Sequence, residues 1–316
     1  MLFCVIYGII EGKTEKEGRG EMSQLCTQCP RACGVDRSET VGFCGVSEGF
    51  CVARAALHHW EEPIISGTRG SGTVFFGGCN LRCAFCQNYE LSHAAKGKTV
   101  DGARLTKIFL DLQERGAHNL NLVTPTQYAR QLVPILREVK PLLQIPVVYN
   151  CGGYESVDSL RALEGLVDVW LPDFKYYSRE LSMRYSAAED YRTVAEAALS
   201  EMLRQAPRPV YGEDGTLQRG VIVRHLVLPS SRADSIRVLR FLAERFGTDA
   251  FLLSLLNQYT PQFAAAAPYP ELHRRVTTFE YESVLAVANE LGFEGFLQGR
   301  ASASASYTPD FSEDTL

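Results

Sequence analysis

The 316-residue sequence has little of several features that would mark out a class of protein. Positive charge is not in excess, since 32 Lys and Arg residues against 37 Asp and Glu residues give a net charge of −5. This balance argues against a general nucleic-acid binder and against attachment to anionic membranes by charge. No run approaches the roughly 18 apolar residues of a membrane-spanning helix, and no internal repeat at a fixed period is evident.

Signals for export are also scarce at the start of the chain. Residues 1–10 are apolar, but no basic leader precedes them and no small-residue cleavage pattern follows. We therefore expect a cytoplasmic protein with no membrane association. Met22 stands just before the first patterned segment, so residues 1–22 are interpreted as a disordered or mis-assigned extension. Residues 298–316 contain a run of alternating Ala and Ser and are expected to form a flexible tail.

Cysteine, in contrast, is plentiful, with ten residues. In a cytoplasmic protein, closely spaced cysteines are more often metal ligands than disulfide partners. Seven of the ten fall into two tight groups, whereas Cys4, Cys51 and Cys151 stand alone.

The more informative group is Cys79, Cys83 and Cys86, with C-x3-C-x2-C spacing. Thiolates are soft ligands that select zinc, copper(I) or iron–sulfur clusters. Three of them leave one iron of a four-iron cluster open, whereas a structural zinc site takes four ligands. The spacing therefore favours a cluster that binds something else at the open iron. The alternative is a zinc knuckle completed by a histidine such as His93.

The second group forms a closed set of four thiolates, at Cys26, Cys29, Cys33 and Cys44. Four ligands suit either a structural zinc ion or an auxiliary iron–sulfur cluster, and the spacing does not separate the two. We interpret residues 23–66 as a small metal-binding module. Because it has so little apolar sequence, such a module needs its metal in order to fold.

A regular alternation of strands and helices follows the module. Short apolar runs predict six strands, at residues 73–76, 120–123, 146–149, 167–171, 221–228 and 250–256. Helical spacing occurs at residues 103–115, 128–139, 156–163, 188–205, 235–246 and 280–291. Alternating strands and helices indicate parallel βαβ units in an α/β fold. Six units are too few for an eight-stranded barrel, so residues 67–297 are expected to form a partial (β/α)6 barrel.

Polar or ligand-type side chains follow most of the predicted strands. In parallel α/β folds, ligands bind at the carboxyl ends of the strands, which lie at one rim. After the first strand comes the three-cysteine loop, and the next three strands lead to the residues Thr124, Thr126, Asn150, Cys151, Asp173 and Lys175. The fifth strand carries Arg224 and His225. We expect these residues to converge on one site.

The segment from Phe76 to Tyr89 resembles the defining motif of the radical S-adenosylmethionine (SAM) superfamily, with Phe85 just before the last cysteine. Finer features resemble a subgroup similar to pyruvate formate-lyase activating enzymes. They include Cys26-Thr27-Gln28-Cys29-Pro30-Arg31-Ala32-Cys33-Gly34, Trp60-Glu61-Glu62-Pro63, Leu171-Pro172-Asp173-Phe174-Lys175-Tyr176, Arg224-His225-Leu226-Val227-Leu228-Pro229 and Gln258-Tyr259-Thr260-Pro261. The resemblance extends from residue 23 to about residue 300.

This resemblance implies a cofactor set and a chemistry. Cys79, Cys83 and Cys86 would hold a [4Fe–4S] cluster whose open iron binds SAM, and the reduced cluster would cleave SAM to a 5′-deoxyadenosyl radical. An electron donor such as flavodoxin or ferredoxin is implied as a partner. Asp173 and Lys175 match a pair that holds SAM in glycyl-radical activating enzymes.

Further contacts to SAM are implied for Asn150, which lies near the same ligand, and for His225, at the adenosine. Activating enzymes often have Gly-Gly-Glu after the second strand, where this chain has Thr124-Pro125-Thr126. A hydroxyl, a carbonyl or a water would then serve in place of the carboxylate.

Several alternatives stay open at this point. The enzyme either installs a glycyl radical on a protein partner or acts on a small molecule or peptide without one. A non-catalytic scaffold with two structural metal sites is the third possibility. For single residues, Asp173 and Lys175 are alternatively a surface ion pair, and His225 a core histidine. Cys151 and the tyrosines near the strand ends are alternatively packing residues.

Overall fold

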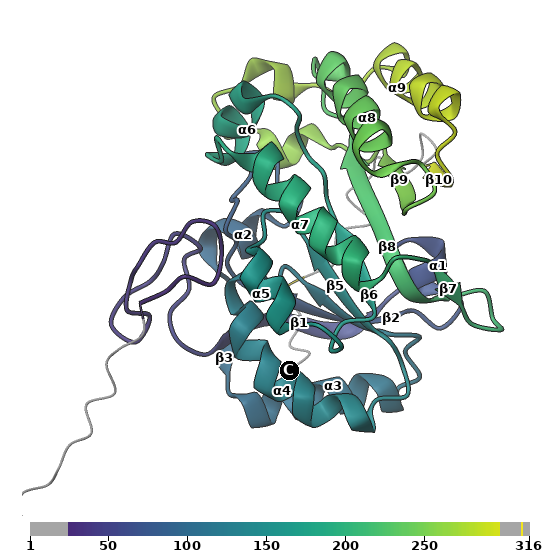
Figure 1. Cartoon of the computed structure of the whole chain (residues 1–316). Coiled ribbons are helices and arrows are strands. Elements are labelled where there is room, and N and C mark those ends of the chain that lie inside the picture. Colours follow the sequence, from purple (N-terminus) through teal and green to yellow (C-terminus); the bar gives the residue numbers. More distant parts are fainter. Residues whose placement is uncertain (1–24, 298–310, 312–316) are drawn as a thin grey trace, which may run out of the picture.

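The computed structural model describes residues 25–297 and residue 311. Nine α-helices and one ten-stranded sheet with a branch occur in these residues (Figure 1). The strands are β1 (Phe50–His58), β2 (Ser71–Phe76), β3 (Lys98–Val100), β4 (Leu120–Val123), β5 (Val147–Cys151), β6 (Val169–Pro172), β7 (Val210–Tyr211), β8 (Leu217–Leu226), β9 (Leu252–Leu256) and β10 (Gly295–Leu297). The helices are α1 (Pro63–Ser66), α2 (Tyr89–Ala94), α3 (Gly102–Glu114), α4 (Ala129–Val139), α5 (Val157–Ala162), α6 (Arg179–Ser186), α7 (Tyr191–Gln205), α8 (Arg232–Phe246) and α9 (Thr278–Leu291). The predicted extension at residues 1–22, with Cys4, and the predicted tail lie outside the described residues, apart from Phe311.

The six predicted strands form the centre of the sheet. They correspond to β2, β4, β5, β6, β8 and β9, which lie side by side in that order and run parallel. Successive right-handed βαβ crossovers produce such an order and place the helices on one face. The prediction of an α/β fold built as a partial (β/α)6 barrel is therefore confirmed by the strand order. β10 continues the parallel array beyond β9.

The sheet also begins earlier in the chain than the sequence predicts. β1 pairs antiparallel with β2, and β3 pairs antiparallel with β1. The main sheet therefore starts inside residues 23–66, the segment expected to form a separate cysteine module. The register of β1 shifts between Val52 and Arg54. Such a bulge interrupts the alternation of side chains by which a strand is detected in a sequence.

Helices α3, α4, α5, α7 and α8 form a layer against one face of the sheet (Figure 1). Their apolar side chains pack on the strands in one large core, with Phe109 of α3 and Leu132 of α4 fully buried. A smaller apolar cluster covers the base of the opposite, inner face and includes Val148, Leu171 and Ile222. Side chains alternate between the two faces along a strand. The side chains two positions after these apolar residues therefore lie on the same face, nearer to the carboxyl ends of the strands.

Helix α3 is capped by Asp101, whose side chain accepts a hydrogen bond from Arg104 N, and α6 is capped by Ser178 in the same way. Among the described residues, no helix has the length and apolar character that crossing a membrane requires.

Candidate functional site

A cavity of about 820 Å³ lies at the carboxyl ends of the parallel strands. Small-molecule and cofactor sites in proteins typically have this size. Its walls come from the three-cysteine loop after β2, from the ends of β4, β5, β6, β8 and β9, and from the segment between β1 and α1. Residues from distant parts of the sequence therefore share one cavity, as expected for the rim of a parallel sheet.

The three-cysteine loop is set in place by two glycines at the end of β2. A Cβ on Gly77 would lie 2.5 Å from Cys51 Sγ, and Gly78 has φ +81°. A side chain at Gly77 would clash with Cys51, and the positive φ of Gly78 is a conformation that favours glycine. The side chain of Gln127 donates hydrogen bonds to both glycine carbonyls at 3.0 Å. The loop is thereby fixed at its entry point.

The three thiols of this loop all line the cavity. Burial, and then the neighbouring thiols Cys83 and Cys86, raise the pKa of Cys79 to about 12. The pKa of Cys86 is raised to about 11, mainly by burial and then by Cys83. Thiols placed so close together in a buried site are poorly stabilised as free thiolates, and a bound metal supplies the missing positive charge.

Each cysteine of a [4Fe–4S] cluster binds a different iron. In residues 25–297, no group of three or more His, Cys, Asp or Glu side chains is arranged as the ligand set of a metal ion. Three thiols of one loop that line one cavity of this volume, one of them buried and two half-buried, fit a cluster that spreads its ligands over separate irons. His93 stacks on Tyr89 with ring centroids 4.1 Å apart and is not part of the cavity wall, so it does not complete a zinc knuckle here.

Phe85, between the second and third cysteines, anchors the loop on an aromatic cluster. Its ring lies edge-on to Tyr176, Tyr185 and Tyr259, with centroids 6.2–6.4 Å apart. Below it, Ser186 at the end of α6 donates a hydrogen bond to Cys83 Sγ at 3.0 Å. The loop is thus held by packing and by a direct bond to one sulfur.

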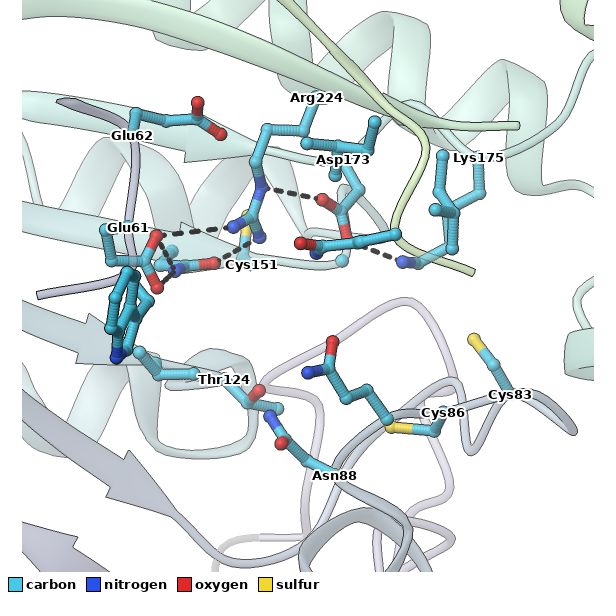
Figure 2. A pocket seen from close by; sticks show the side chains of 18 of the residues that line it. Glu61, Glu62, Cys83, Cys86, Asn88, Thr124, Cys151, Asp173, Lys175 and Arg224 are labelled. Atoms are coloured by element: carbon cyan, nitrogen blue, oxygen red, sulfur yellow. Dashed lines mark hydrogen bonds and ion pairs between the residues drawn. The ribbon is translucent and has the colours of Figure 1, made fainter. Parts of the chain in front are cut away.

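Charged side chains form the wall across from the thiols (Figure 2). Asp173 accepts hydrogen bonds from Lys175 Nζ at 2.5 Å and from Arg224 Nε at 2.9 Å. Burial opposes ionisation of Asp173, but Arg224 and Lys175 together hold its pKa below the usual value. Likewise, burial opposes the charge on Lys175, but the carboxylate of Asp173 raises its pKa. Both groups are therefore charged at neutral pH. They line the cavity and are 19% and 18% exposed, so they form an ion pair of the cavity wall and not one on the outer surface.

Asp173 and Lys175 both lie beyond the end of β6. β6 ends at Pro172, and Asp173 makes one isolated bridge to Arg224 on β8. Lys175 lies two residues further along, beyond the strand, so its side chain can bend back to Asp173.

Asn150, near the end of β5, connects this pair to a second carboxylate. Its carbonyl oxygen accepts a hydrogen bond from Arg224 at 2.5 Å, and its amide nitrogen lies 3.2 Å from Glu61 Oε1. Glu61 also lies 3.4 Å from Arg224 NH1. The amide of Asn150 is therefore committed to protein partners, which makes it a residue that orients Glu61 and Arg224.

Glu61 and Glu62 come from the Trp60–Pro63 segment and were not predicted as site residues. Glu62 Oε1 accepts a hydrogen bond from Ser254 at 2.8 Å, and burial raises its pKa. Glu61, in contrast, faces the cavity, where its carboxylate contacts the amide nitrogen of Asn150 and lies 3.4 Å from Arg224 NH1. Their position in space depends on the pairing of β1 with β2, which the sequence does not reveal. The one sequence signal for these two carboxylates is that they belong to the Trp60–Pro63 motif.

His225 is not brought to this site, which corrects the expectation that it contacts the adenosine. It follows Arg224 on β8, and adjacent side chains of a strand point to opposite faces. His225 is 1% exposed, does not line the cavity, and has its Nδ1 2.7 Å from the carbonyl of Phe174. Burial lowers its pKa to about 4, so the ring is neutral. It is the core histidine that the sequence left as an alternative.

The loop after β4 is divided between cavity and core. Thr124 lines the cavity and has a left-handed φ of +57°, an unusual conformation for a β-branched residue. Thr126 turns away and donates a hydrogen bond to the buried Glu155 at 2.6 Å. Cys151 lines the cavity, whereas Tyr149 packs against Trp170 behind the sheet.

With this geometry in view, comparisons with known proteins become informative. Residues 66–180 match the family model of a 4Fe-4S single cluster domain. That stretch contains the three-cysteine loop together with Asp173 and Lys175. This stretch of the chain is therefore similar to domains that bind one four-iron cluster.

Two further proteins are similar to this chain. It is 29% identical over 280 residues to the uncharacterized protein MJ0674 of Methanocaldococcus jannaschii, a match that covers 85% of this chain and 75% of that protein. The crystal structure of methylornithine synthase (PylB) aligns with 16% identity and a TM-score of 0.45. That alignment covers 69% of this chain and 63% of the synthase, which is less than two thirds of its length.

Proposed function

We propose that the protein is a radical SAM enzyme. The observation that carries the proposal is the cavity itself, in which three thiols of one loop face a wall of paired charges formed by Asp173, Lys175 and Arg224. The match of residues 66–180 to a 4Fe-4S single cluster domain supports the cluster. When bound, a reduced [4Fe–4S] cluster supplies the electron that cleaves SAM to methionine and a 5′-deoxyadenosyl radical.

The protein's own residues would bind and orient SAM. Its methionine part carries a carboxylate and an ammonium group, which require one positive and one negative partner. Lys175 faces the thiols and is the cation suited to the carboxylate. Glu61 is the carboxylate suited to the ammonium, because Asp173 is already shared by two cations. Glu61 would thus supply the carboxylate that binds the ammonium group of SAM, since the segment Thr124-Pro125-Thr126 after β4 contains no acidic residue.

Asp173, Asn150 and Arg224 would act as positioning residues. Each makes its hydrogen bonds to other side chains of the wall and thereby fixes Lys175 or Glu61. Such fixed polar groups need no rearrangement when the ligand binds. Phe75, Leu226 and Leu256 give the rest of the cavity an apolar lining that excludes water from a reactive radical.

A finer proposal concerns the substrate, which we infer to be a protein or peptide. Trp60 lines the cavity next to Glu61 and is 62% exposed, and exposed aromatic residues are typical of protein interfaces. Installation of a glycyl radical on a partner is one such reaction, and reaction with a small molecule is the alternative. Electron paramagnetic resonance of a candidate partner after incubation separates them, because only the former gives a glycyl doublet. A cytoplasmic location and a flavodoxin or ferredoxin as electron donor belong to the same proposal.

The test of the main proposal is reductive cleavage of SAM. Protein purified without oxygen and loaded with iron and sulfide is mixed with SAM and a strong reductant, and 5′-deoxyadenosine is quantified by mass spectrometry. We expect product from the wild type and none from Cys79→Ala/Cys83→Ala/Cys86→Ala. Wild-type protein that holds about four irons yet forms no 5′-deoxyadenosine would contradict the proposal.

A further inference from the structure

Four cysteines before β1 lie in a segment without regular structure. Residues 25–49, all of which the structure describes, contain no helix and no strand, and Figure 1 shows them as loops at one side of the sheet. Cys29 and Cys44 are buried, Cys26 is half-buried, and Cys33 is exposed. A segment of this kind has few apolar side chains to hold its shape and depends on cross-links or metals.

Two of the four thiols lie beside one glycine. A Cβ on Gly42 would lie 3.1 Å from Cys33 Sγ and 3.5 Å from Cys44 Sγ, so both sulfurs occupy the space next to this glycine. Cys33 and Cys44 are therefore neighbours in space, and Cys26 and Cys29 belong to the same short loop as Cys33.

Backbone hydrogen bonds close the loop that carries these ligand-type residues. Cys26 N donates to Val35 O at 2.9 Å, and Gly34 N donates to Cys26 O at 3.1 Å. Cys29 and Cys33 lie within the loop closed in this way. Cys44, whose sulfur lies beside the same glycine as that of Cys33, adds a fourth thiol next to this loop, a ligand number typical of thiolate metal sites.

This segment is fastened directly to the three-cysteine loop of the cavity. Cys79 N donates a hydrogen bond to Cys44 O at 3.1 Å. Arg31, between Cys29 and Cys33, donates to the carbonyls of Asn80 and Ser186, each at 2.8 Å. The hydrogen bond from Cys79 N to Cys44 O therefore links a cysteine of the three-cysteine loop to one of the four cysteines before β1.

We propose that Cys26, Cys29, Cys33 and Cys44 bind a second metal centre, either a zinc ion or an iron–sulfur cluster, which fixes the three-cysteine loop from behind. In the described residues these thiols do not yet surround one point as the ligands of a bound ion do. Metal binding therefore closes the segment, as is common where binding and folding are coupled. The proposal goes beyond the proposed function, because it holds whatever reaction the cavity performs.

Metal analysis tests the site without any assay of SAM. Iron, acid-labile sulfide and zinc are measured in anaerobically purified wild type and in Cys79→Ala/Cys83→Ala/Cys86→Ala. We expect about four irons plus one zinc, or about eight irons, in the wild type, and a loss of about four irons in the triple variant. Wild type with about four irons and no zinc would overturn the proposal.

Cys33→Ala assigns the second centre to its residues. Cys33 is exposed, so its loss removes a ligand and little packing, and Cys51→Ala removes a half-buried thiol outside both sets as the matched control. We expect Cys33→Ala to lose the second metal while Cys51→Ala keeps it. Unchanged metal content in both Cys33→Ala and Cys44→Ala would overturn the assignment.

The coupling to the cavity has its own readout. In Cys33→Ala, we expect the absorbance of the remaining cluster to decay several-fold faster in air than in wild type. Equal decay rates would show that the second metal does not support the loop. These results stand apart from the proposed function, since metal content and decay are measured whether or not SAM is cleaved.

Discussion

Arg224 Nε donates a hydrogen bond to Asp173 Oδ1 at 2.9 Å, and this contact joins β8 to the end of β6 at the cavity wall. The other oxygen of Asp173 accepts from Lys175. One carboxylate is therefore shared by two cations, Arg224 on β8 and Lys175 in the segment after β6. The position of Lys175 depends on a residue that, in the proposed arrangement, does not itself contact SAM.

Asp173→Asn is expected to weaken SAM binding roughly tenfold, because Lys175 would lose its charged partner and its fixed position. The affinity for SAM is measured by equilibrium dialysis with the reconstituted protein. The matched control is Asp168→Asn, at the start of β6, where Asp168 pairs with Lys140 far from the cavity. We expect the control to lower the free energy of unfolding and to leave SAM affinity unchanged. Equal affinities in Asp173→Asn and wild type would refute the positioning role.

Ser186→Ala is expected to lower the reduction potential of the cluster. The hydroxyl of Ser186 donates to Cys83 Sγ at 3.0 Å, and hydrogen bonds to cluster sulfurs favour the more negative, reduced form. Loss of about 1 kcal/mol corresponds to a shift of roughly 40 mV for one electron. The potential is measured by redox titration followed by electron paramagnetic resonance. Ser182→Ala, a buried serine on the same helix whose hydroxyl bonds Arg179 O, should leave it unchanged.

Stability should fall as pH rises toward neutral because of Glu155. Burial raises its pKa to about 7 from the ordinary 4.5, so the folded state binds a proton that the unfolded state has already released. The contribution is fully present below about pH 4.5 and is lost as pH rises through about 7, in total about 3 kcal/mol.

Glu155→Gln keeps the shape of the side chain and removes this titration. Urea denaturation between pH 4.5 and pH 8 should therefore show a flatter dependence in Glu155→Gln than in wild type. Glu90→Gln changes an exposed glutamate paired with Lys96 and serves as the control with a wild-type profile. Parallel curves for wild type and Glu155→Gln would contradict the assignment of this pH dependence to Glu155.

Arg31→Ala is expected to loosen the three-cysteine loop while leaving the four cysteines of the proposed second metal site in place. Arg31 donates hydrogen bonds to three carbonyls of the cavity side, those of Asn80, Ser186 and Ala187, and stacks on Phe43 with 4.1 Å to the ring centroid. We expect faster loss of the cavity cluster to a chelator, with unchanged second metal, followed by absorbance and metal analysis. Arg130→Ala, whose side chain touches Thr27 of the same segment, is the control. If Arg31→Ala and Arg130→Ala lose the cavity cluster to the chelator at the same rate, Arg31 does not fix the three-cysteine loop.

The sequence predicts the barrel well because its strands are short apolar runs between turn residues. β4 coincides with residues 120–123 as predicted, and the other central strands differ by a few residues at their ends. The three-cysteine motif, Asp173 and Lys175 were also recognisable, since each directly follows a predicted strand. Local pattern and spacing carry this information without any knowledge of distant contacts.

The missed features depend on distant contacts. Both faces of β8 are apolar, so alternation alone does not decide whether Arg224 or His225 points into the cavity. Glu61 reaches the site only because β1 turns back along β2. The bulge between Val52 and Arg54 interrupts the alternation of side chains in β1, so the sequence pattern does not predict this strand. Each case is a tertiary arrangement that no short window of sequence records.

The antiparallel pairing of β1 with β2 has a practical consequence for anyone who trims the protein to its recognisable core. The match to the 4Fe-4S domain begins at residue 66, after β1 has ended. A chain cut there would expose the hydrogen-bonding edge of β2, a strand in which every residue is buried. Open edges of this kind pair with other molecules. Such a fragment would aggregate through β2, and its lost activity would say nothing about its chemistry.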